Sequence, residues 1–357
     1  MKLVHDPIHG HIELDDFALK LVDTPEFQRL RRITQLGLAF LAYPSARHTR
    51  FEHSLGTFHL AKEMRRYNPE LEEGVTYAAL LHDLGHYPFS HTLEGLYPRH
   101  EENTRWMIRH GEIGDVLKER YSPGEMERLL KHPVVSGDID ADRMDYLVRD
   151  AYYTGAAYGI VDLERLIRNI RWMDGKLVLL EKGVTAGQSL LLARAMMYPT
   201  VYFHHTARIA GAMLEKAVEL ERIGLEEIRT MDEIDLVSRL RASEESEVRE
   251  LISAIDSRRL YKRVLWSGEP LGRDLLKELR AELEAEFGYL ALVDYPPKPK
   301  FEERKAFVLV GGELKRLSDV SPLVRSLFEL KDTHWRWGVY AREDVREKVR
   351  DILEKLL

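Results

Sequence analysis

Residues 80–91 read LLHDLGHYPFSH and place an adjacent histidine and aspartate, His82 and Asp83, at the end of an apolar run. The run YAALL predicts a helix that is buried on its inward face and stops at Gly85. A buried imidazole and carboxylate side by side need partners. Asp83 can cap the turn, His82 can be a satisfied core residue, or the pair can hold a metal ion through an imidazole nitrogen and a carboxylate oxygen. Two ligands are too few for a metal, so that reading requires other segments to meet this helix end.

Composition narrows the chemistry that the pair can support. The 357 residues include no cysteine, which excludes disulfides, thiolate ligands and cysteine nucleophiles and leaves histidine and carboxylate as metal ligands. A net charge of -7 offers no basic excess for a general nucleic-acid surface. The chain shows no apolar run of membrane-spanning length and no signal peptide, so we expect a cytoplasmic protein without a membrane segment. Only six amide side chains beside many charged ones resemble the composition of a thermophile.

The hydrophobic pattern predicts a mainly α protein, with a helical domain over residues 1–222 and a smaller α+β lobe over 223–357. In the first part we expect a strand or hairpin in HDPIHGHIELDD and a short strand at 176–181. Helices are expected at 15–22, 24–37, 50–67, 74–85, 101–120, 123–131, 140–150, 162–172 and 185–222. The lobe should contain charged, solvated helices near 225–286, a loop at 296–300, a hairpin turning at Gly311-Gly312, a strand in HWRWGVYA and a closing helix.

Two further predicted helices carry polar residues that can join His82 and Asp83. One contains His53 within RFEHSLG, and the other is the aspartate-rich stretch DIDADRMDYLVRD. A histidine, a His-Asp pair and an aspartate from three helices would suit one divalent cation. The spacing leaves open which aspartate takes part: Asp138, Asp140, Asp142, Asp145 or Asp150.

Six stretches in this order resemble a known family: DPIHGHIEL, DTPEFQRLRRITQLG, RFEHSLG, LLHDLGHYPFSH, RHEE and DRMDYLVRD. The chain is similar to the HD superfamily of metal-dependent phosphohydrolases, and within it to the deoxynucleoside triphosphate triphosphohydrolases. The resemblance is strong over residues 2–210 and weak beyond. It implies an HD-domain helical bundle and hydrolysis of a deoxynucleoside triphosphate (dNTP) to a deoxynucleoside and triphosphate.

The resemblance implies a set of metal ligands and catalytic residues. The family's motif of aspartate, basic residue, any residue and Asp-Tyr selects Asp142, so the implied ligands are His53, His82, Asp83 and Asp142. They would hold one divalent ion, with Mn, Mg, Fe, Ni and Zn as candidates. The implied catalytic residues are His86 and His91, facing the phosphates, and the acid/base pair His100 and Glu101.

The same likeness implies a substrate pocket. Arg50 and Arg143 would offset phosphate charge, and Arg143 stands where the animal enzyme has lysine. The positions implied to contact phosphate or sugar are Tyr146, Asp150, Gln35, Leu36 and Tyr202, the last crowding the 2′ position and so rejecting ribonucleotides.

A regulatory guanine-nucleotide site is also implied, at Lys2, Asp23, Gln28 and Arg31. It would lie between subunits of a homo-oligomer, a dimer or tetramer, whereas the simpler reading makes Asp23 a helix cap. The hairpin histidines His5, His9 and His11 are interpreted as lying away from the ligand set. Two other functions stay open: an HD phosphatase acting on another nucleotide or phosphate ester, and a nucleotide-binding regulatory protein with little turnover.

Overall fold

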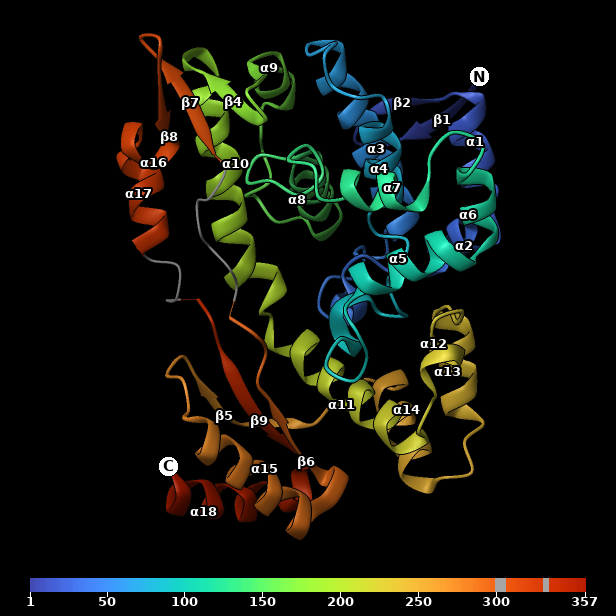
Figure 1. Cartoon of the computed structure of the whole chain (residues 1–357). Coiled ribbons are helices and arrows are strands. Elements are labelled where there is room, and N and C mark those ends of the chain that lie inside the picture. The colour runs from blue at the N-terminus through green and yellow to red at the C-terminus, as the bar shows by residue number, and fades with distance from the viewer. Residues whose placement is uncertain (299–305, 330–333) are drawn as a thin grey trace.

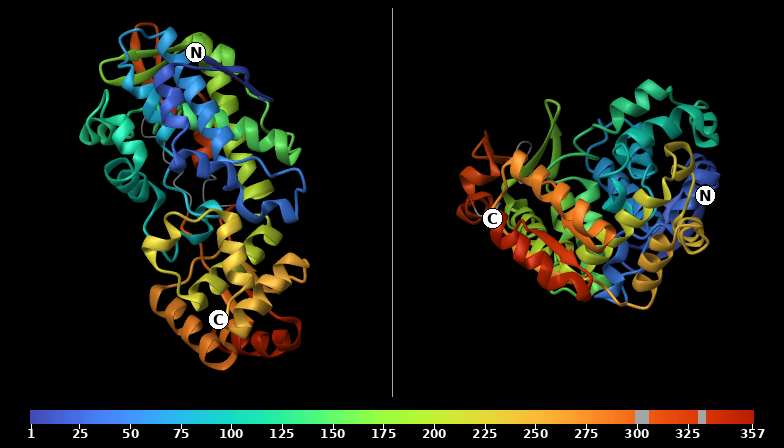
Figure 2. Two further views of the ribbon diagram at one scale, coloured as in Figure 1. Left: turned by 90° about the vertical axis from the view of Figure 1, so that its right-hand side faces the viewer. Right: turned by 90° about the horizontal axis from the view of Figure 1, so that it is seen from below.

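The computed structural model describes residues 1–298, 306–329 and 334–357, so the loop expected at 296–300 lies partly outside the described residues. The protein is mainly helical, as predicted; besides an N-terminal hairpin, the described residues form two small sheets from strands between residues 170 and 341. A long helical run, α10 (Val184–Met197) followed by α11 (His205–Glu221), crosses from one half of the molecule to the other (Figure 1). The two termini lie at opposite ends of the molecule (Figure 2).

The N-terminal half is built around a helix that is buried along its whole length. Every residue of α4 (Gly74–Leu81) is buried, as an all-apolar helix requires. It packs against α3 (Arg50–Arg66), which in turn packs against α8 (Ala141–Thr154). Thr49 and Glu52 form a capping box at the start of α3, and Asp140 caps α8. The predicted N-terminal hairpin is present as β1 (Lys2–Asp6) and β2 (Gly10–Leu14).

The remaining helices of this half surround these three, and several are shorter than predicted. The expected helix at 24–37 ends at residue 32, the one at 101–120 breaks at Gly111, and residues 170–173 form a strand instead of the end of a helix. The expected helix at 185–222 is interrupted by a π-helical turn, Tyr198–Tyr202, that contains Pro199. The other helices are α1 (Asp16–Val22), α2 (Pro25–Arg29), α5 (His100–His110), α6 (Glu112–Leu117), α7 (Pro123–Leu129) and α9 (Leu163–Arg168), with short 3-10 turns at Leu30–Arg32, Gly37–Leu41 and Ser90–Leu93.

Strands from distant parts of the chain share one four-stranded sheet. Its order is β3-β4-β7-β8, and β4 pairs with β7 in parallel. The division of domains at residue 222 stays a prediction, and this sheet crosses it. The predicted Gly-Gly hairpin joins β7 to β8, and both glycines have positive φ, which glycine adopts without strain. The bounds are β3 (Ile170–Met173), β4 (Lys176–Leu180), β7 (Phe307–Val310) and β8 (Glu313–Arg316).

The smaller α+β lobe is present as a second, three-stranded antiparallel sheet with order β5-β9-β6, packed with α15 and α18 (Figure 1). The expected strand in HWRWGVYA is its central strand β9. The bounds are β5 (Lys262–Ser267), α15 (Arg273–Phe287), β6 (Ala291–Asp294), β9 (Trp337–Ala341) and α18 (Arg346–Leu356). The helices α12 (Leu225–Ile228), α13 (Glu233–Arg241) and α14 (Ser246–Asp256) lie beside α11, and α16 (Leu317–Val320) and α17 (Pro322–Glu329) follow β8.

Three apolar clusters hold these parts together. The first fills the N-terminal half around α3 and α4, and the third lies between α15, α18 and the three-stranded sheet. The second joins side chains of α11, α13 and α14 to Leu38, Tyr87, Phe89 and Leu93. Within the described parts of the chain, no helix combines the length and apolar composition that crossing a bilayer requires.

Candidate metal centre and catalytic site

The four predicted metal ligands lie together where α3, α4 and α8 meet. His53 Nε2 lies 3.2 Å from His82 Nε2, 3.1 Å from Asp142 Oδ1 and 3.5 Å from Asp83 Oδ2. His82 Nε2 lies 3.3 Å from Asp83 Oδ1 and 3.5 Å from Asp142 Oδ1. Ligands that share one ion at bond lengths of about 2.1 Å are separated by about 3.0–3.4 Å. The separations among His53, His82 and Asp142 therefore fit a single divalent cation. Asp83 faces the two histidines through different carboxylate oxygens.

The hydrogen bonds of the two histidines support the same fit. His53 Nδ1 lies 2.8 Å from Asp145 Oδ2, and His82 Nδ1 lies 2.8 Å from the carbonyl oxygen of Ala79. When each Nδ1–H donates to these acceptors, both Nε2 lone pairs face each other and two carboxylates. Burial alone lowers the pKa of His53, but hydrogen bonds to Asp142 and Asp145 raise it to about 10. The group therefore favours a positive charge at its centre, and a divalent ion would displace a proton there.

Asp145 orients His53 from behind and is itself held by a buried network. Its carboxylate, fully buried, accepts from Arg149 Nε at 2.8 Å and Nη2 at 2.9 Å and lies 2.6 Å from His9 Nε2. Arg149 Nη1 donates to Asp6 Oδ2 at 2.7 Å. The placement of the hairpin histidines away from the ligand set is therefore wrong for His9, which contacts the carboxylate that orients His53. Sequence spacing could not reveal this contact because 136 residues separate the two partners.

Glycine allows this network to form. A Cβ atom at Gly56, in the RFEHSLG motif, would lie 1.8 Å from Asp145 Oδ1 and 2.6 Å from Arg149 Nη2. The helices α3 and α8 can therefore place a buried carboxylate between them only if residue 56 has no side chain.

A second polar group, formed by His86, His91, Glu94 and His100, lies beside the first. His100 Nδ1 lies 2.5 Å from Glu94 Oε1, and His91 Nδ1 lies 3.1 Å from Glu94 Oε2. The His86 and His100 rings stack at 3.9 Å. Glu101, the predicted partner of His100, is farther away, with Oε2 at 3.7 Å from Nδ1. Sequence reasoning missed Glu94, and its position three residues after His91 was the available signal.

His86 connects the two groups. It is fully buried, its Nε2 lies 3.3 Å from Asp83 Oδ1, and neither ring nitrogen has a hydrogen-bond partner among the described residues. Burial and the charge of Arg50 hold the pKa of His86 well below its usual range, so the ring is neutral. Orphaned nitrogens on a neutral buried imidazole mark a place where a ligand or water completes the site.

Close approach of α5 sets the position of His100. A Cβ atom at Gly85 would lie 2.2 Å from the backbone nitrogen of Thr104 and 2.3 Å from the carbonyl oxygen of His100. Gly85 N–H donates to Thr104 Oγ1 at 2.9 Å, and Asn103 Nδ2 donates to Gly85 O at 2.8 Å. Gly85, two residues after Asp83, therefore allows the close approach of α5, which carries the predicted catalytic residue His100.

The two predicted phosphate-binding arginines have different surroundings. Arg50 is buried, with Nη1 at 2.5 Å from Asp83 Oδ2, and it also donates to Ser90 Oγ and to the carbonyl of Gln35. Arg143 keeps a 19% exposed side chain, and its Nη1 pairs with Asp140 Oδ2 at 2.7 Å. Arg143 is therefore the more accessible cation, whereas Arg50 fixes a predicted ligand.

One face of α8 links the metal group to the predicted sugar pocket. Asp142, Tyr146 and Asp150 follow one another at intervals of four residues. Asp150 is buried; its Oδ2 accepts the hydroxyl of Tyr202 at 2.8 Å, and its Oδ1 lies 2.8 Å from His48 Nε2.

Gln35, predicted from the sequence, and Arg194, which was not predicted, lie near this face of α8. Gln35 Oε1 is buried without a hydrogen-bond partner among the described residues, beside the half-buried Leu36. Burial raises the pKa of the Tyr146 hydroxyl, and the positive charge of Arg194, on α10, lowers it, which places Arg194 near Tyr146. Arg194 carried no signal in the quoted motifs.

The predicted regulatory residues lie on the surface or bind one another. Lys2 and Asp23 are exposed, and Asp23 is the C-cap residue of α1. Gln28 Oε1 accepts from Arg31 Nε at 2.8 Å, and the Arg31 guanidinium lies 3.5 Å from the centre of the Phe51 ring. Whether these residues bind a nucleotide stays a prediction.

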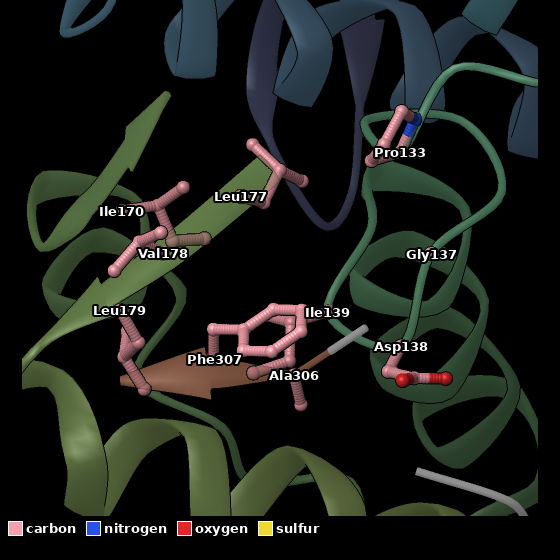
Figure 3. Close-up of a pocket in the computed structure, with 10 residues that line it drawn as sticks. All are labelled: Pro133, Gly137, Asp138, Ile139, Ile170, Leu177, Val178, Leu179, Ala306 and Phe307. Atoms are coloured by element: carbon pink, nitrogen blue, oxygen red, sulfur yellow. The ribbon is translucent and has the colours of Figure 1, made fainter. Parts of the chain in front are cut away.

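A mainly apolar pocket lies next to the candidate site and does not include it. It is formed between the β3-β4-β7 side of the sheet and the loop that precedes α8 (Figure 3). None of the predicted site residues lines it. The lining residues are Pro133, Gly137, Asp138, Ile139, Ile170, Leu177, Val178, Leu179, Ala306 and Phe307.

Comparisons with known proteins agree with this geometry. The HD domain model matches residues 50–149, which contain all four predicted ligands, and the HD associated region model matches residues 161–357. An uncharacterized protein of Methanocaldococcus jannaschii is 40% identical over 100% of this chain and 84% of its own length. A deoxynucleoside triphosphate triphosphohydrolase SAMHD1 homolog of Dictyostelium discoideum is 31% identical over 80% of this chain and 66% of its own length.

Solved structures show the same fold over nearly the whole chain. A hypothetical protein from Aquifex aeolicus superposes with a TM-score of 0.81 at 33% identity and covers 99% of both chains. A phosphohydrolase from Bacteroides thetaiotaomicron gives a TM-score of 0.80 at 27% identity, covering 96% of this chain and 100% of that one. The chain therefore belongs to the HD superfamily of phosphohydrolases, in the family that includes the SAMHD1-type deoxynucleoside triphosphate triphosphohydrolases.

Proposed function

We propose that this protein hydrolyses deoxynucleoside triphosphates to the deoxynucleoside and inorganic triphosphate. The observation that carries the proposal is the face of α8 on which Asp142, Tyr146 and Asp150 lie one turn apart. It joins a group of metal-binding character to a buried carboxylate beside Tyr202. The name of the Dictyostelium relative supports the substrate class.

The phosphate end of the pocket would be held by this chain's cations and by a neutral imidazole. Arg143, the more exposed arginine, can bind phosphate oxygens with its planar donors. His86 offers a buried Nδ1 without a hydrogen-bond partner among the described residues, and its Nε2 lies 3.3 Å from Asp83 Oδ1. His53, His82, Asp83 and Asp142 would hold one divalent ion, which when bound polarises a phosphate oxygen and lowers the pKa of a water.

Proton transfer would fall to the histidines that share Glu94. In the reaction the oxygen of water bonds to the α-phosphorus and the water gives up one proton, while the bond from phosphorus to the 5′ oxygen breaks and the 5′ oxygen takes up a proton. His91 and His100 both contact Glu94 through Nδ1, which fixes the ring orientation and leaves each Nε2 for the substrate. We assign the proton donation to this pair, with Glu94 as the residue that orients it.

Sugar selection would follow from Asp150, Gln35 and Tyr202. Asp150 and the unpaired Gln35 Oε1 can accept the 3′-hydroxyl, which satisfies a buried acceptor. The Tyr202 ring, held by its hydroxyl on Asp150, would crowd a 2′-hydroxyl. We therefore propose that ribonucleotides are rejected on steric grounds.

The test is to incubate the protein with each dNTP and each ribonucleotide in Mn²⁺ or Mg²⁺ and to separate the products by ion-exchange chromatography. Deoxynucleoside and triphosphate in equal amounts would support the proposal, and turnover of dGTP without GTP would support the role of Tyr202. Orthophosphate or another phosphate product would favour the HD phosphatase alternative. No product from any nucleotide, with nucleotide bound, would favour the regulatory protein.

We also propose, from the resemblance alone, that a guanine nucleotide binds near Lys2, Asp23, Gln28 and Arg31 in a homo-oligomer. Light scattering with and without GTP or dGTP, together with dNTP hydrolysis rates, tests this. No change in mass or rate, in the protein and in Asp23→Ala alike, would leave Asp23 as a residue of the helix end.

A further inference from the structure

Residues 86–93, which include His91, contribute polar side chains to the candidate site and apolar side chains to a cluster shared with the HD associated region. Tyr87, Phe89 and Leu93 are buried in the same apolar cluster as side chains of α11, α13 and α14. His86 and His91, which alternate with them, belong to the polar group of the site. The apolar support of this segment therefore comes mainly from residues beyond 161, together with Leu38, and not from the core around α3 and α4.

The backbone of this segment needs such support. Phe89 and Ser90 are consecutive non-glycine residues with φ of 58° and 55°, in the left-handed region. Residues with side chains adopt this conformation at a cost, and it persists only where surrounding contacts hold it.

Glu233, the first residue of α13, makes the contact that joins this segment to the pocket. Its Oε1 accepts from the Phe89 N–H at 3.1 Å, from the Thr34 N–H at 2.7 Å and from the Thr34 hydroxyl at 2.6 Å. Thr34 directly precedes Gln35 and Leu36, the predicted sugar contacts. One carboxylate oxygen of the HD associated region thus binds two loops of the candidate site.

The residues just before Glu233 reinforce its position. The carbonyl of Met231 accepts from Arg29 Nη1 at 2.9 Å, and Arg29 Nη2 donates to the carbonyls of Leu84 and His86 at 3.0 and 2.9 Å. Asp232 pairs with Arg32 and caps α13. Three consecutive residues therefore each contact the N-terminal half.

The contacts continue from Glu233 to a predicted metal ligand. Ser90 Oγ donates to the carbonyl of Thr34 at 2.5 Å and accepts from Arg50 Nε at 2.9 Å. Arg50 Nη1 then lies 2.5 Å from Asp83 Oδ2. A continuous series of hydrogen bonds connects α13 with the HD pair.

We propose that Glu233 is a positioning residue through which the HD associated region holds the 34–36 and 87–93 loops in the arrangement that catalysis needs. This inference rests on the proposed function for its kinetic consequence, but the coupling of the loops to α13 is a property of the fold. Glu233 contacts neither the predicted ligands nor His91 directly, so it acts through Thr34 and Phe89.

The experiment compares Glu233→Ala and Glu233→Gln with the unaltered protein and with Glu226→Ala. Glu226 is a matched control, because it is an exposed carboxylate of neighbouring α12 that pairs with Arg229. Three quantities are measured in each: amide hydrogen exchange by mass spectrometry, kcat and KM for dNTP hydrolysis, and bound metal. Metal content reports on the ligand set independently of the loops.

In Glu233→Ala we expect faster exchange in peptides covering 87–93 and a kcat lower by about 10- to 100-fold, the effect of leaving buried N–H and O–H donors without an acceptor. KM and metal content should change much less. Glu233→Gln keeps an acceptor oxygen and should recover most of kcat, which a general loss of stability would not produce. Glu226→Ala should match the unaltered protein in all three measurements.

Unchanged exchange over 87–93 and unchanged kcat in Glu233→Ala would overturn the inference. If that variant does not fold, Thr34→Val removes one of the three hydrogen bonds, and a normal kcat with normal exchange in Thr34→Val would overturn it equally. If the unaltered protein hydrolyses no dNTP, the proposed function fails, while the exchange comparison still decides whether Glu233 holds the loops.

Discussion

A methyl group at residue 56 has no room in this fold, which makes Gly56→Ala a direct test of the buried network behind the metal group. The new Cβ would lie 1.8 Å from Asp145 Oδ1, so the carboxylate must move by more than 1 Å to regain ordinary contact, about 3.4 Å or more. Asp145 has nowhere to go without loosening its bonds to Arg149 and His53. The substitution should therefore damage both stability and metal binding.

Two opposing effects set the change in unfolding free energy of Gly56→Ala. Disrupting a buried ion pair costs about 3–5 kcal/mol, whereas replacing glycine by alanine inside a helix gains about 0.5–1 kcal/mol. We expect Gly56→Ala to lose about 2–4 kcal/mol of unfolding free energy. Because Asp145 orients His53, a predicted metal ligand, metal affinity should fall by about 10- to 100-fold.

The matched control is Gly124→Ala, at a helical glycine of α7 whose Cβ would meet nothing within 4 Å. That change should stabilise the protein slightly, by at most about 1 kcal/mol. Thermal unfolding by circular dichroism and metal content by mass spectrometry after dialysis give the two readouts. A Gly56→Ala protein as stable as Gly124→Ala, with full metal, would refute the tight placement of Asp145.

Three other outcomes are expected. Asp83→Asn should lose most of its bound metal in the same mass-spectrometric assay, since it removes one of two ligand charges. His9→Ala should lower metal affinity by about tenfold, because His9 loses its contact with Asp145. His11 is exposed on the same hairpin, so His11→Ala should leave the affinity unchanged. Competition with a chelator measures both affinities. Burial raises the pKa of Glu215 to about 7. Between pH 4.5 and 7 the folded protein therefore keeps a proton on Glu215 that the unfolded chain has lost, so the free energy of unfolding falls as the pH rises through this range. Glu215→Gln should therefore raise the melting temperature more at pH 8 than at pH 5.

The helices that bear the candidate ligands were predictable because each has a strong local signal. The apolar run of α4 is buried on all sides, and Thr49 with Glu52 forms the capping box that starts α3. Helix ends were less predictable. The stop at Gly111 and the π-helical turn containing Pro199 depend on residues that a helix can also tolerate near its termini.

Strand pairing was not predictable from the same sequence. Short apolar runs predict a strand at 176–181 and another before the Gly311-Gly312 turn, but they do not say which strand lies next to which. The parallel pairing of β4 with β7 brings together segments that are more than 120 residues apart along the printed sequence. The predicted domain boundary at residue 222 was placed where the composition of the sequence changes. The four-stranded sheet joins strands from both sides of that boundary, which composition does not reveal.

In the polar site, too, some residues were predictable from the sequence and others were not. A family motif marks residues that would touch metal or substrate, such as His53 and His100, and the structure brings them together. The motif contains Asp145 without indicating that this carboxylate orients His53, and Glu94 lies outside the quoted stretches. Asp145 contacts His53 and His9, and Glu94 contacts His91 and His100, so each carboxylate fixes two imidazoles. Of these four contacts, only the one between His91 and Glu94, three residues apart, follows from spacing along the chain. A ring held at one nitrogen presents the other in a defined direction, and that direction, more than the identity of the histidine, determines whether it can bind a cation or transfer a proton.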